Sequence, residues 1–452
     1  MLLFAAIAVG AALITLVNPM AGIVLALKAD VATSIVLAPI LGASYGEGEN
    51  QHHTLLITLP VLAVLLVRMI LQILSRRKSM AIPAFNSVDL GLFGLIVVVT
   101  FGSFRSESFI FGSEIVGRLL VLGVSYYIFS RTAVVCKNDV KRSVLSFMIL
   151  VWLLSVGSGL YVLFSTGEIG SNVISAAGEI VGKVSLTKVN PISFSMLMGE
   201  AILVALFWLL SNRDSSRLLT FSILCSLPLL FGLMLTTAER GPFLSLVMAA
   251  AFLTVALILI GNDARYLVYS AIFFSAVLAG GVALYLSQPA LSEGLAGRIS
   301  DLGSGESTVG IRIRLYSQAL DLFGESPLLG NGTGALENIN GRGLYAHNLI
   351  LEILAEQGLL GFAMLSIFLA GLVNRIKTSI LLYHDPICAY FAALVLFHLA
   401  ESMVSGTLWG LKSLYFAAGM LVVLEYLARE DFANYWESPC HACQYGCVEG
   451  CE

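Results

Sequence analysis

Long apolar segments, separated by short polar ones, recur along the whole chain. A helix needs about 20 predominantly apolar residues to cross the hydrocarbon core of a bilayer. The candidate segments are 2–17, 20–43, 54–74, 90–104, 113–130, 143–165, 191–210, 218–237, 243–261, 266–287, 347–372, 386–403 and 410–428. They are continuous rather than alternating, and a backbone in lipid is satisfied only in helices or closed barrels. The pattern therefore predicts an all-α integral membrane protein, a polytopic bundle of about 12 to 13 transmembrane helices.

The composition supports a membrane protein. Of 452 residues, 58% are hydrophobic and 12% are charged, whereas a soluble domain carries roughly 25% charged residues. The net charge of -4 and the lack of a long basic run give no sign of a nucleic-acid partner. No basic residues precede the first segment, so we expect a membrane segment rather than a cleaved signal peptide. The first two segments are the least regular, because Asn18-Pro19 breaks one and Lys28 and Asp30 interrupt the other.

Basic residues in short loops predict the orientation, since such loops stay in the cytoplasm. They alternate correctly with the spans at Arg76–Lys78, 131–142, Arg213 with Arg217, Arg265, Arg375 with Lys377, and Arg429. The complementary loops then face outward: 44–53, 105–112, 166–190, 238–242, 288–346 and 404–409. We expect four parts: an N-terminal transmembrane bundle (1–287), a long extracytoplasmic loop carrying short amphipathic helices (288–346), C-terminal transmembrane helices (347–428) and a cysteine-rich cytoplasmic tail (429–452).

The outward loops carry arginines that the orientation rule disfavours there. Arg240 lies in the turn "TTAERGPF", where it is either an interfacial snorkelling residue or a phosphate ligand held in a fixed turn. Arg312 and Arg314 lie in "STVGIRIRLYSQALDLF". We expect 311–323 to be an amphipathic helix, with Leu315, Ala319, Leu320 and Phe323 on or near one face. Two residues apart on a helix, the two arginines lie about 200° apart, so they are unlikely to share a role.

The loop "SPLLGNGTGAL" contains three alternating glycines, Gly330, Gly332 and Gly334. A nucleotide-binding loop needs a preceding strand and a following helix. In addition, no ATP or NAD is available outside the membrane. The favoured interpretation is a tight turn that returns the loop to the bundle. The alternative is a close approach of its backbone amides to a diphosphate.

His347 begins "HNLILEILAEQGLLG", at the predicted outer end of a span. Asn348 is a plausible N-cap, and the positive helix end disfavours imidazolium, which leaves a neutral ring able to act as a general base. The bland alternative is a histidine packed among lipid headgroups. Glu352 and Glu356 follow on the same helix, where Glu356 is expected to be structural.

These residues together indicate a reaction at the outer face. No paired metal ligands and no Ser-His-Asp arrangement are evident in the sequence, so we expect neither metal nor cofactor. A reaction without a nucleotide must use a donor that is already activated and already in the membrane, and lipid-linked diphosphate sugars fit. Arginines would hold the diphosphate, and a histidine would take the proton from an attacking hydroxyl.

The combined motifs resemble the O-antigen ligase and O-antigen polymerase superfamily. The matching positions are Pro327, Leu328, Gly330, Gly332, His347, Asn348, Leu351, Glu352, Glu356, Gly358 and Gly361. "VGIRIRLYSQAL" is similar to the family's arginine segment and places Arg312 on its arginine. "TTAERGPF" is similar to the family's Thr-x-Ser-Arg-Gly turn, with Glu239 in place of serine, and "VNPISFSM" looks like its Asn-Pro entry to a span.

The resemblance implies a metal-independent, inverting membrane glycosyltransferase of the bacterial inner membrane, with its active site facing the periplasm or cell exterior. The implied donor is an undecaprenyl-diphosphate-linked oligosaccharide, and the acceptor is a glycan or a lipid A core. The implied base is His347, and Arg240 and Arg312 are implied to engage the donor diphosphate. Arg314, Arg342, Lys188, Asn348 and Glu352 form a second tier of candidates.

Several alternatives stay open in the sequence. Polymerase, ligase and protein glycosyltransferase are not separated, although the lack of an obvious second acceptor module slightly favours a polymerase. A small-anion transporter is the competing class, because Lys28 and Asp30 lie deep in a candidate span. Other polysaccharide assembly proteins are further candidate partners. The tail places Cys440, Cys443, Cys447 and Cys451 at spacings compatible with zinc, acylation or simple disorder.

Overall fold

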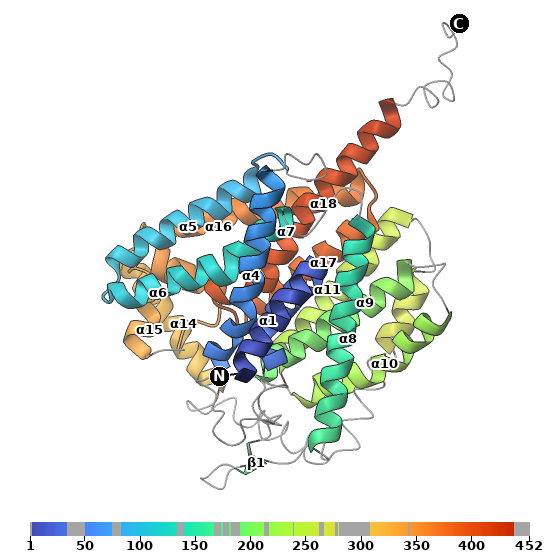
Figure 1. The fold of residues 1–452 in the computed structure, drawn as a ribbon. Helices are drawn as coiled ribbons and strands as arrows, with labels where there is room; N and C mark the ends of the chain where they lie inside the picture. Colours follow the sequence, from blue (N-terminus) through green and yellow to red (C-terminus); the bar gives the residue numbers. More distant parts are fainter. Residues whose placement is uncertain are drawn as a thin grey trace, which may run out of the picture.

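The computed structural model of the chain (Figure 1) describes residues 2–33, 50–74, 83–132, 140–166, 173–174, 180–181, 190–211, 217–237, 239–261, 266–275, 279, 308–341 and 344–437. Lys188, Arg342 and the four tail cysteines lie outside these residues. The helices are α1 (Leu2–Val17), α2 (Pro19–Leu27), α4 (Asn50–Leu74), α5 (Ser87–Arg105), α6 (Phe109–Leu119), α7 (Ser125–Thr132), α8 (Val140–Thr166), α9 (Pro191–Ser211), α10 (Arg217–Thr236), α11 (Arg240–Gly261), α14 (Thr308–Glu325), α15 (Ala335–Asn340), α16 (Leu349–Leu381), α17 (Pro386–Ser402) and α18 (Lys412–Glu437). A π-helical turn, η2 (Leu120–Val124), joins α6 to α7, and a 3₁₀ turn, η5 (Leu408–Gly410), precedes α18.

The predicted all-α polytopic architecture is confirmed. Within the described part of the chain, 8 helices are long and apolar enough to cross a membrane, and three shorter apolar helices accompany them. The described strands are only the two-residue β1 (Val173–Ile174) and β2 (Ile180–Val181), which pair antiparallel. The expected total of about 12 to 13 spans, and the division into four parts, stay predictions.

Three helices begin in the same way, with an Asn or Asp followed by proline. Asn18, Asn190 and Asp385 each accept hydrogen bonds from the second and third backbone amides beyond them, at 2.7 to 3.3 Å. Proline suits the first helical position because its missing N–H would have no partner there. The Asn-Pro pair at 190–191 therefore starts α9, as the sequence predicts.

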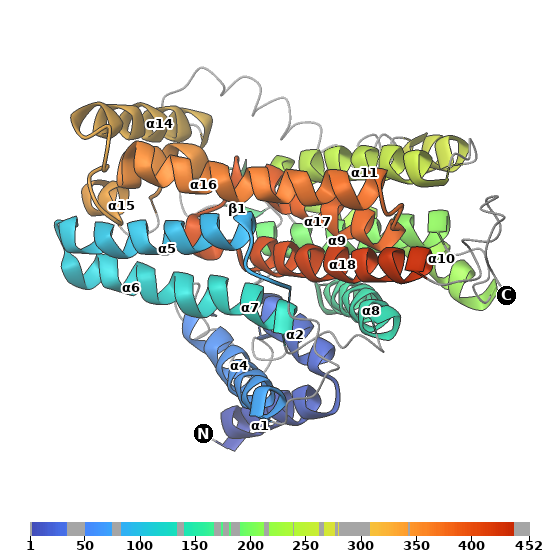
Figure 2. The ribbon, with the colours of Figure 1, turned by 90° about the horizontal axis from the view of Figure 1, so that it is seen from above.

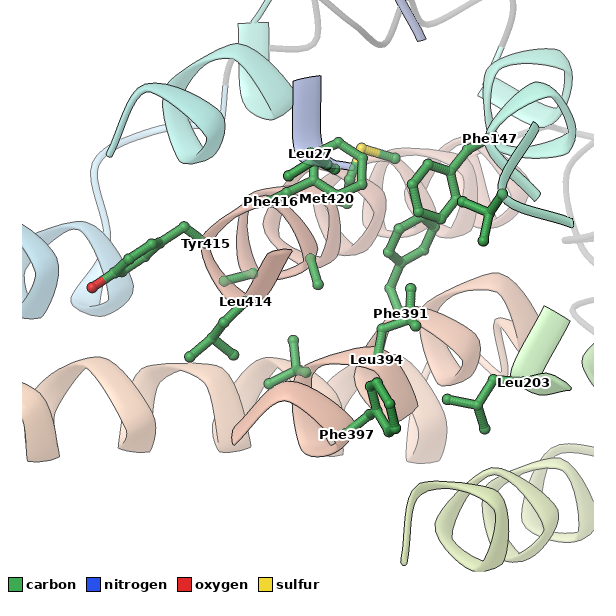
Figure 3. Packing of buried hydrophobic residues seen from close by; sticks show 14 of the residues in the cluster. Leu27, Phe147, Leu203, Phe391, Leu394, Phe397, Leu414, Tyr415, Phe416 and Met420 are labelled. Carbon is green, nitrogen blue, oxygen red and sulfur yellow. The ribbon is translucent and has the colours of Figure 1, made fainter. Parts of the chain in front are cut away.

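The packing places α17 and α18 at the centre of the bundle, beside α9 and α11, as seen from above in Figure 2. On the opposite flank α14 lies over α16, α16 lies along α5, and α5 lies along α6. Figure 3 shows the centre, where Phe391 of α17 and Phe416 of α18 meet Phe147 of α8. The ring centroid of Phe147 lies 5.7 Å from that of Phe391 and 5.1 Å from that of Phe416. These fully buried rings fix α17 to α18.

The glycine-rich loop is a packing element. Gly330, Gly332 and Gly334 all have φ between 71° and 97°, a region that favours glycine. A Cβ at Gly330 would lie 2.3 Å from the backbone of Glu356, and one at Gly332 would lie 2.7 Å from the backbone of Ser106. The loop is thus wedged, backbone to backbone, between the end of α5 and the first part of α16.

The amides of this loop are already used within the protein. Asn331 N and Gly332 N donate to the carbonyls of Ala355 and Glu356, each at 3.0 Å, and Thr333 N donates to Gly102 O at 3.1 Å. Arg105, a residue that the sequence did not single out, donates to Leu329 O at 2.8 Å and to Gly330 O at 2.6 Å. The tight-turn interpretation is therefore favoured over a diphosphate-binding loop.

Helix α16 is broken where it meets this loop. Gly358 has φ 62° and ψ -159° in the middle of the helix, and the amides beyond it turn to the loop, Leu359 N to Pro327 O at 2.8 Å and Leu360 N to Leu328 O at 3.1 Å. The carboxylate of Glu356 faces the amides of Gly334 and Leu336, which supports its expected structural role. The first turns of α16 therefore form one unit with α14, α15 and the loop.

Helix α14 confirms the amphipathic helix that the sequence predicts, but its buried face differs from the predicted one. Leu315 and Ala319 are buried as expected, whereas Leu320 is 54% exposed and Leu322 is buried instead. Five residues after Leu315 on a helix, Leu320 points about 140° away from it. Leu322, seven residues on, returns to the same side and packs with Ala319, Leu336 and Ala346.

The charged residues of the second predicted segment find partners in distant helices. Lys28 forms a buried ion pair with Glu200 of α9, and His398 Nε2 of α17 lies 3.2 Å from the same carboxylate. Asp30 pairs instead with Lys412, at 3.4 Å. Lys28, Glu200 and His398 are each at most 6% exposed, so this charge cluster ties α2, α9 and α17 together.

We expect Gly330→Ala to destabilise the protein strongly, because the added Cβ would meet the backbone of Glu356 and the left-handed φ disfavours any side chain. Gly324→Ala is the matched control, since nothing lies within 4 Å of its Cβ position. Thermal unfolding of both purified variants in nanodiscs measures the difference. Equal midpoints of thermal unfolding in the two variants would contradict the close backbone packing of the glycine-rich loop.

We expect Glu200→Gln to cost about 3 kcal/mol of stability, because it leaves Lys28 charged and buried. Adding Lys28→Met should recover a large part of that loss, because the double variant buries no unpaired charge. Chemical unfolding of the two single variants and the double variant tests this coupling. Additive losses would show that Lys28 and Glu200 do not act as a pair.

Candidate active site

His347 stands at the entrance of α16 in a strained backbone conformation. Its φ is 52°, which is uncommon for a residue other than glycine and concentrates at functional sites. Asn348 is the N-cap, as predicted: its Oδ1 accepts from Ile350 N and Leu351 N, each at 3.1 Å. The ring of Tyr345 lies against the imidazole, with 4.1 Å between centroids. The imidazole is thus held against Tyr345 just before the first turn of α16.

The surroundings of His347 keep its ring neutral. Burial lowers the pKa of the imidazole below its usual value, and the nearby positive charge of Arg312 lowers that pKa further. Nδ1 is buried and has no hydrogen-bond partner among the described residues. A neutral imidazole with an unsatisfied nitrogen is suited to accept a proton.

Arg312 brings a positive charge from α14 to this histidine. The side chain is half-buried, and it interacts electrostatically with His347, Tyr345 and Glu401. Within the described part of the chain its guanidinium makes neither a hydrogen bond nor an ion pair. Arg314 is exposed and lies about 200° around the same helix, so the structure does not bring it to His347.

Arg240 is the first residue of α11 and is exposed. The adjacent glycine lies beside Glu401, the residue with which Arg312 also interacts: a Cβ at Gly241 would lie 2.6 Å from Oε2 of Glu401. Among the described residues Arg240 forms no ion pair, so the pairing with Glu239 that the sequence allows is not formed. The start of α11 at Gly241 and Arg312 of α14 thus both lie near Glu401.

Asn348 and Glu352 position the start of α16 rather than line an open site. Asn348 Nδ2 donates to Met403 O at 3.2 Å, and Glu352 Oε1 accepts from Leu408 N at 3.3 Å. Both contacts reach the segment between α17 and α18. The two second-tier residues therefore fix the helix that carries His347 to the central pair of helices.

The sequence analysis did not identify the acidic residue of the site, Glu401. Glu401 lies at the end of α17, 3% exposed, and it is among the residues that line a cavity of about 340 Å³ together with Lys28, Asp30, Tyr345, His398 and Lys412. The only sequence signal was a polar pair, Glu401 and Ser402, that ends a long apolar run. Such a pair reads as an ordinary helix end until the packing of α11 and α14 is known.

Comparison with known proteins agrees with the motifs. Residues 225–366 match a protein-family model described as O-Antigen ligase. The matched region contains Arg240, Arg312 and His347. A search of curated proteins found no match to the chain. Over residues 225–366, this comparison therefore supports the resemblance to the O-antigen ligase and polymerase family that the motifs indicate.

Proposed function

We propose that the protein is a glycosyltransferase that moves an oligosaccharide from an undecaprenyl-diphosphate-linked donor to an acceptor hydroxyl. One observation carries this proposal: a neutral histidine lies near Arg312, whose guanidinium group has no ion-pair partner among the described residues. An unpaired guanidinium group near a base suits a substrate that brings a diphosphate and a reacting hydroxyl to the same place.

The proposed reaction is an inverting displacement. The acceptor oxygen attacks the anomeric carbon of the donor sugar, and the bond from that carbon to the diphosphate oxygen breaks. His347 takes the proton of the acceptor hydroxyl. Arg312 and Arg240 stabilise the negative charge that develops on the leaving diphosphate. The charges balance without a metal ion, so the mechanism is proposed to be metal-independent.

The proposed location is the bacterial inner membrane, with the site facing the periplasm or cell exterior. Basic loops support this orientation, since Arg375 and Lys377 lie at the far end of α16 from His347. The acceptor is proposed to be a second lipid-linked glycan, which makes the protein a polymerase, with a lipid A core as the alternative.

His347→Ala should abolish transfer, because it removes the proposed base. His384→Ala is the matched control: it has the same residue type and the same left-handed φ, 51°, and lies beyond the other end of α16. Purified protein is given undecaprenyl-diphosphate-linked oligosaccharide with and without a lipid A core. A ladder on donor alone indicates a polymerase, and a single addition that requires the core indicates a ligase. Full activity in His347→Ala would rule out its role as the base.

The pH profile of transfer should reveal the effect of the Arg312 charge on the pKa of His347. Transfer, as kcat/KM, should stay level near neutral pH and fall as the pH drops through the lowered pKa of His347, because the protonated ring is no longer a base. Arg312→Gln removes a positive charge, so the pKa of His347 rises and the acid limb moves to higher pH. Arg217→Gln, an exposed arginine of α10, should leave the limb in place. An unchanged limb in Arg312→Gln would contradict this coupling.

A further inference from the structure

A polar cavity is lined by Tyr345, the residue whose ring packs on His347. Its volume is about 340 Å³, and its walls come from α2, α9, the end of α17 and the segment that leads to α18. The walls include Asn190, Ile192, Ser405, Thr407 and Trp409 as well as the charged residues already described. Ligand pockets in proteins start at about 300 Å³, so the cavity has room for a ligand of roughly one sugar residue.

Glu401 is the unsatisfied group of this cavity. It is 3% exposed, and neither side-chain oxygen has a described partner in good hydrogen-bond geometry. The Ser405 hydroxyl acts on it as a nearby donor, and Glu239 and Arg312 act on it electrostatically. A buried carboxyl group with incompletely satisfied oxygens is costly, and a ligand whose hydroxyl or N–H groups donate to it reduces that cost.

The other charges of the cavity are already paired. Lys28 is paired with Glu200, and Lys412 with Asp30. An anionic ligand would find no unpaired cation among the residues that line the cavity. A neutral ligand rich in hydroxyl groups needs no cation and supplies hydrogen-bond partners for Glu401. The cavity is thus better suited to a neutral ligand than to the donor diphosphate.

Tyr345 connects the cavity to the proposed base. It lines the cavity, and its ring packs on His347. Its hydroxyl donates to Ser405 O at 3.2 Å, which holds this wall in place. On the other side, Trp409 lines the cavity and is braced by Arg118, whose guanidinium carbon lies 4.9 Å from the ring centroid. Aromatic walls and a carboxylate acceptor together suit a sugar ring.

We propose that this cavity is the acceptor subsite, which binds the terminal neutral sugar of the acceptor glycan, with Glu401 accepting hydrogen bonds from its hydroxyl groups. The inference rests on the proposed function, since it assigns the acceptor to the same site. It places the acceptor sugar between Trp409 and Tyr345, so that one hydroxyl lies beside His347. The donor diphosphate then lies outside the cavity, at Arg312 and Arg240, which are not among the residues that line it.

Direct binding tests this assignment on the full chain in nanodiscs. Saturation-transfer NMR is recorded with the methyl glycosides of glucose, galactose, mannose, rhamnose and N-acetylglucosamine. At least one should bind the native protein, and its signal should fall about tenfold in Glu401→Gln and in Ile192→Trp, which fills the cavity but keeps the carboxylate. Leu244→Trp, at a 56% exposed position of α11, is the control for a new tryptophan. No binding to the native protein, or equal binding in both cavity variants, overturns the acceptor subsite.

A second arm separates this inference from the proposed function. Farnesyl diphosphate, as a soluble donor analogue, should bind the native protein and Glu401→Gln equally and should bind Arg312→Ala at least tenfold more weakly. Retained farnesyl diphosphate binding in Glu401→Gln also shows that this variant is folded. Sugar binding without Arg312-dependent diphosphate binding would contradict the proposed donor site alone. The reverse result would contradict the acceptor subsite alone.

Discussion

The site depends on a backbone-to-backbone contact between the glycine-rich loop and the broken helix α16. The chain at Gly330 and Gly332 approaches the backbone of Glu356 and Ser106 at distances that no side chain permits. Helix α14 is far in sequence from the described element before it. The contact of the glycine-rich loop therefore sets how α14 lies on α16. Since α14 carries Arg312 and α16 begins just after His347, the glycine contact fixes the distance between the arginine and the proposed base.

Polar side chains in and around the site divide into those bound to other parts of the protein and those without hydrogen-bond partners among the described residues. Arg105, Asn348, Glu352, Lys28 and Glu200 are bound to other parts of the protein. In a membrane protein such contacts hold helices together, because apolar surfaces alone do not distinguish helix from lipid. His347 Nδ1 and the Glu401 oxygens are buried without hydrogen-bond partners. Such groups are costly unless a ligand completes them.

Local features of the site could be predicted from the sequence, and its long-range features could not. The cap at Asn348, the start of α9 at Pro191 and the helix around Arg312 follow from residues within one or two turns, so the sequence alone predicts them. The partner of Lys28 lies in α9, 172 residues away along the chain, and no local pattern identifies it. Glu401 reads as a helix end until Gly241 and Arg312 are seen beside it. The expectation that Leu320 shares the buried face is wrong, because five residues after Leu315 it lies about 140° around the helix.

The charge of Arg312 orders the proposed reaction. Arg312 acts on His347, has no ion-pair partner among the described residues and does not line the cavity, whereas Lys28 and Lys412 within the cavity are paired. A diphosphate is therefore attracted to the arginine rather than into the cavity, where a neutral hydroxyl can be bound. Donor and acceptor would be separated in this way before they meet at the histidine. The same positive charge lowers the pKa of the imidazole, so the charge that would bind the leaving group also keeps the base neutral.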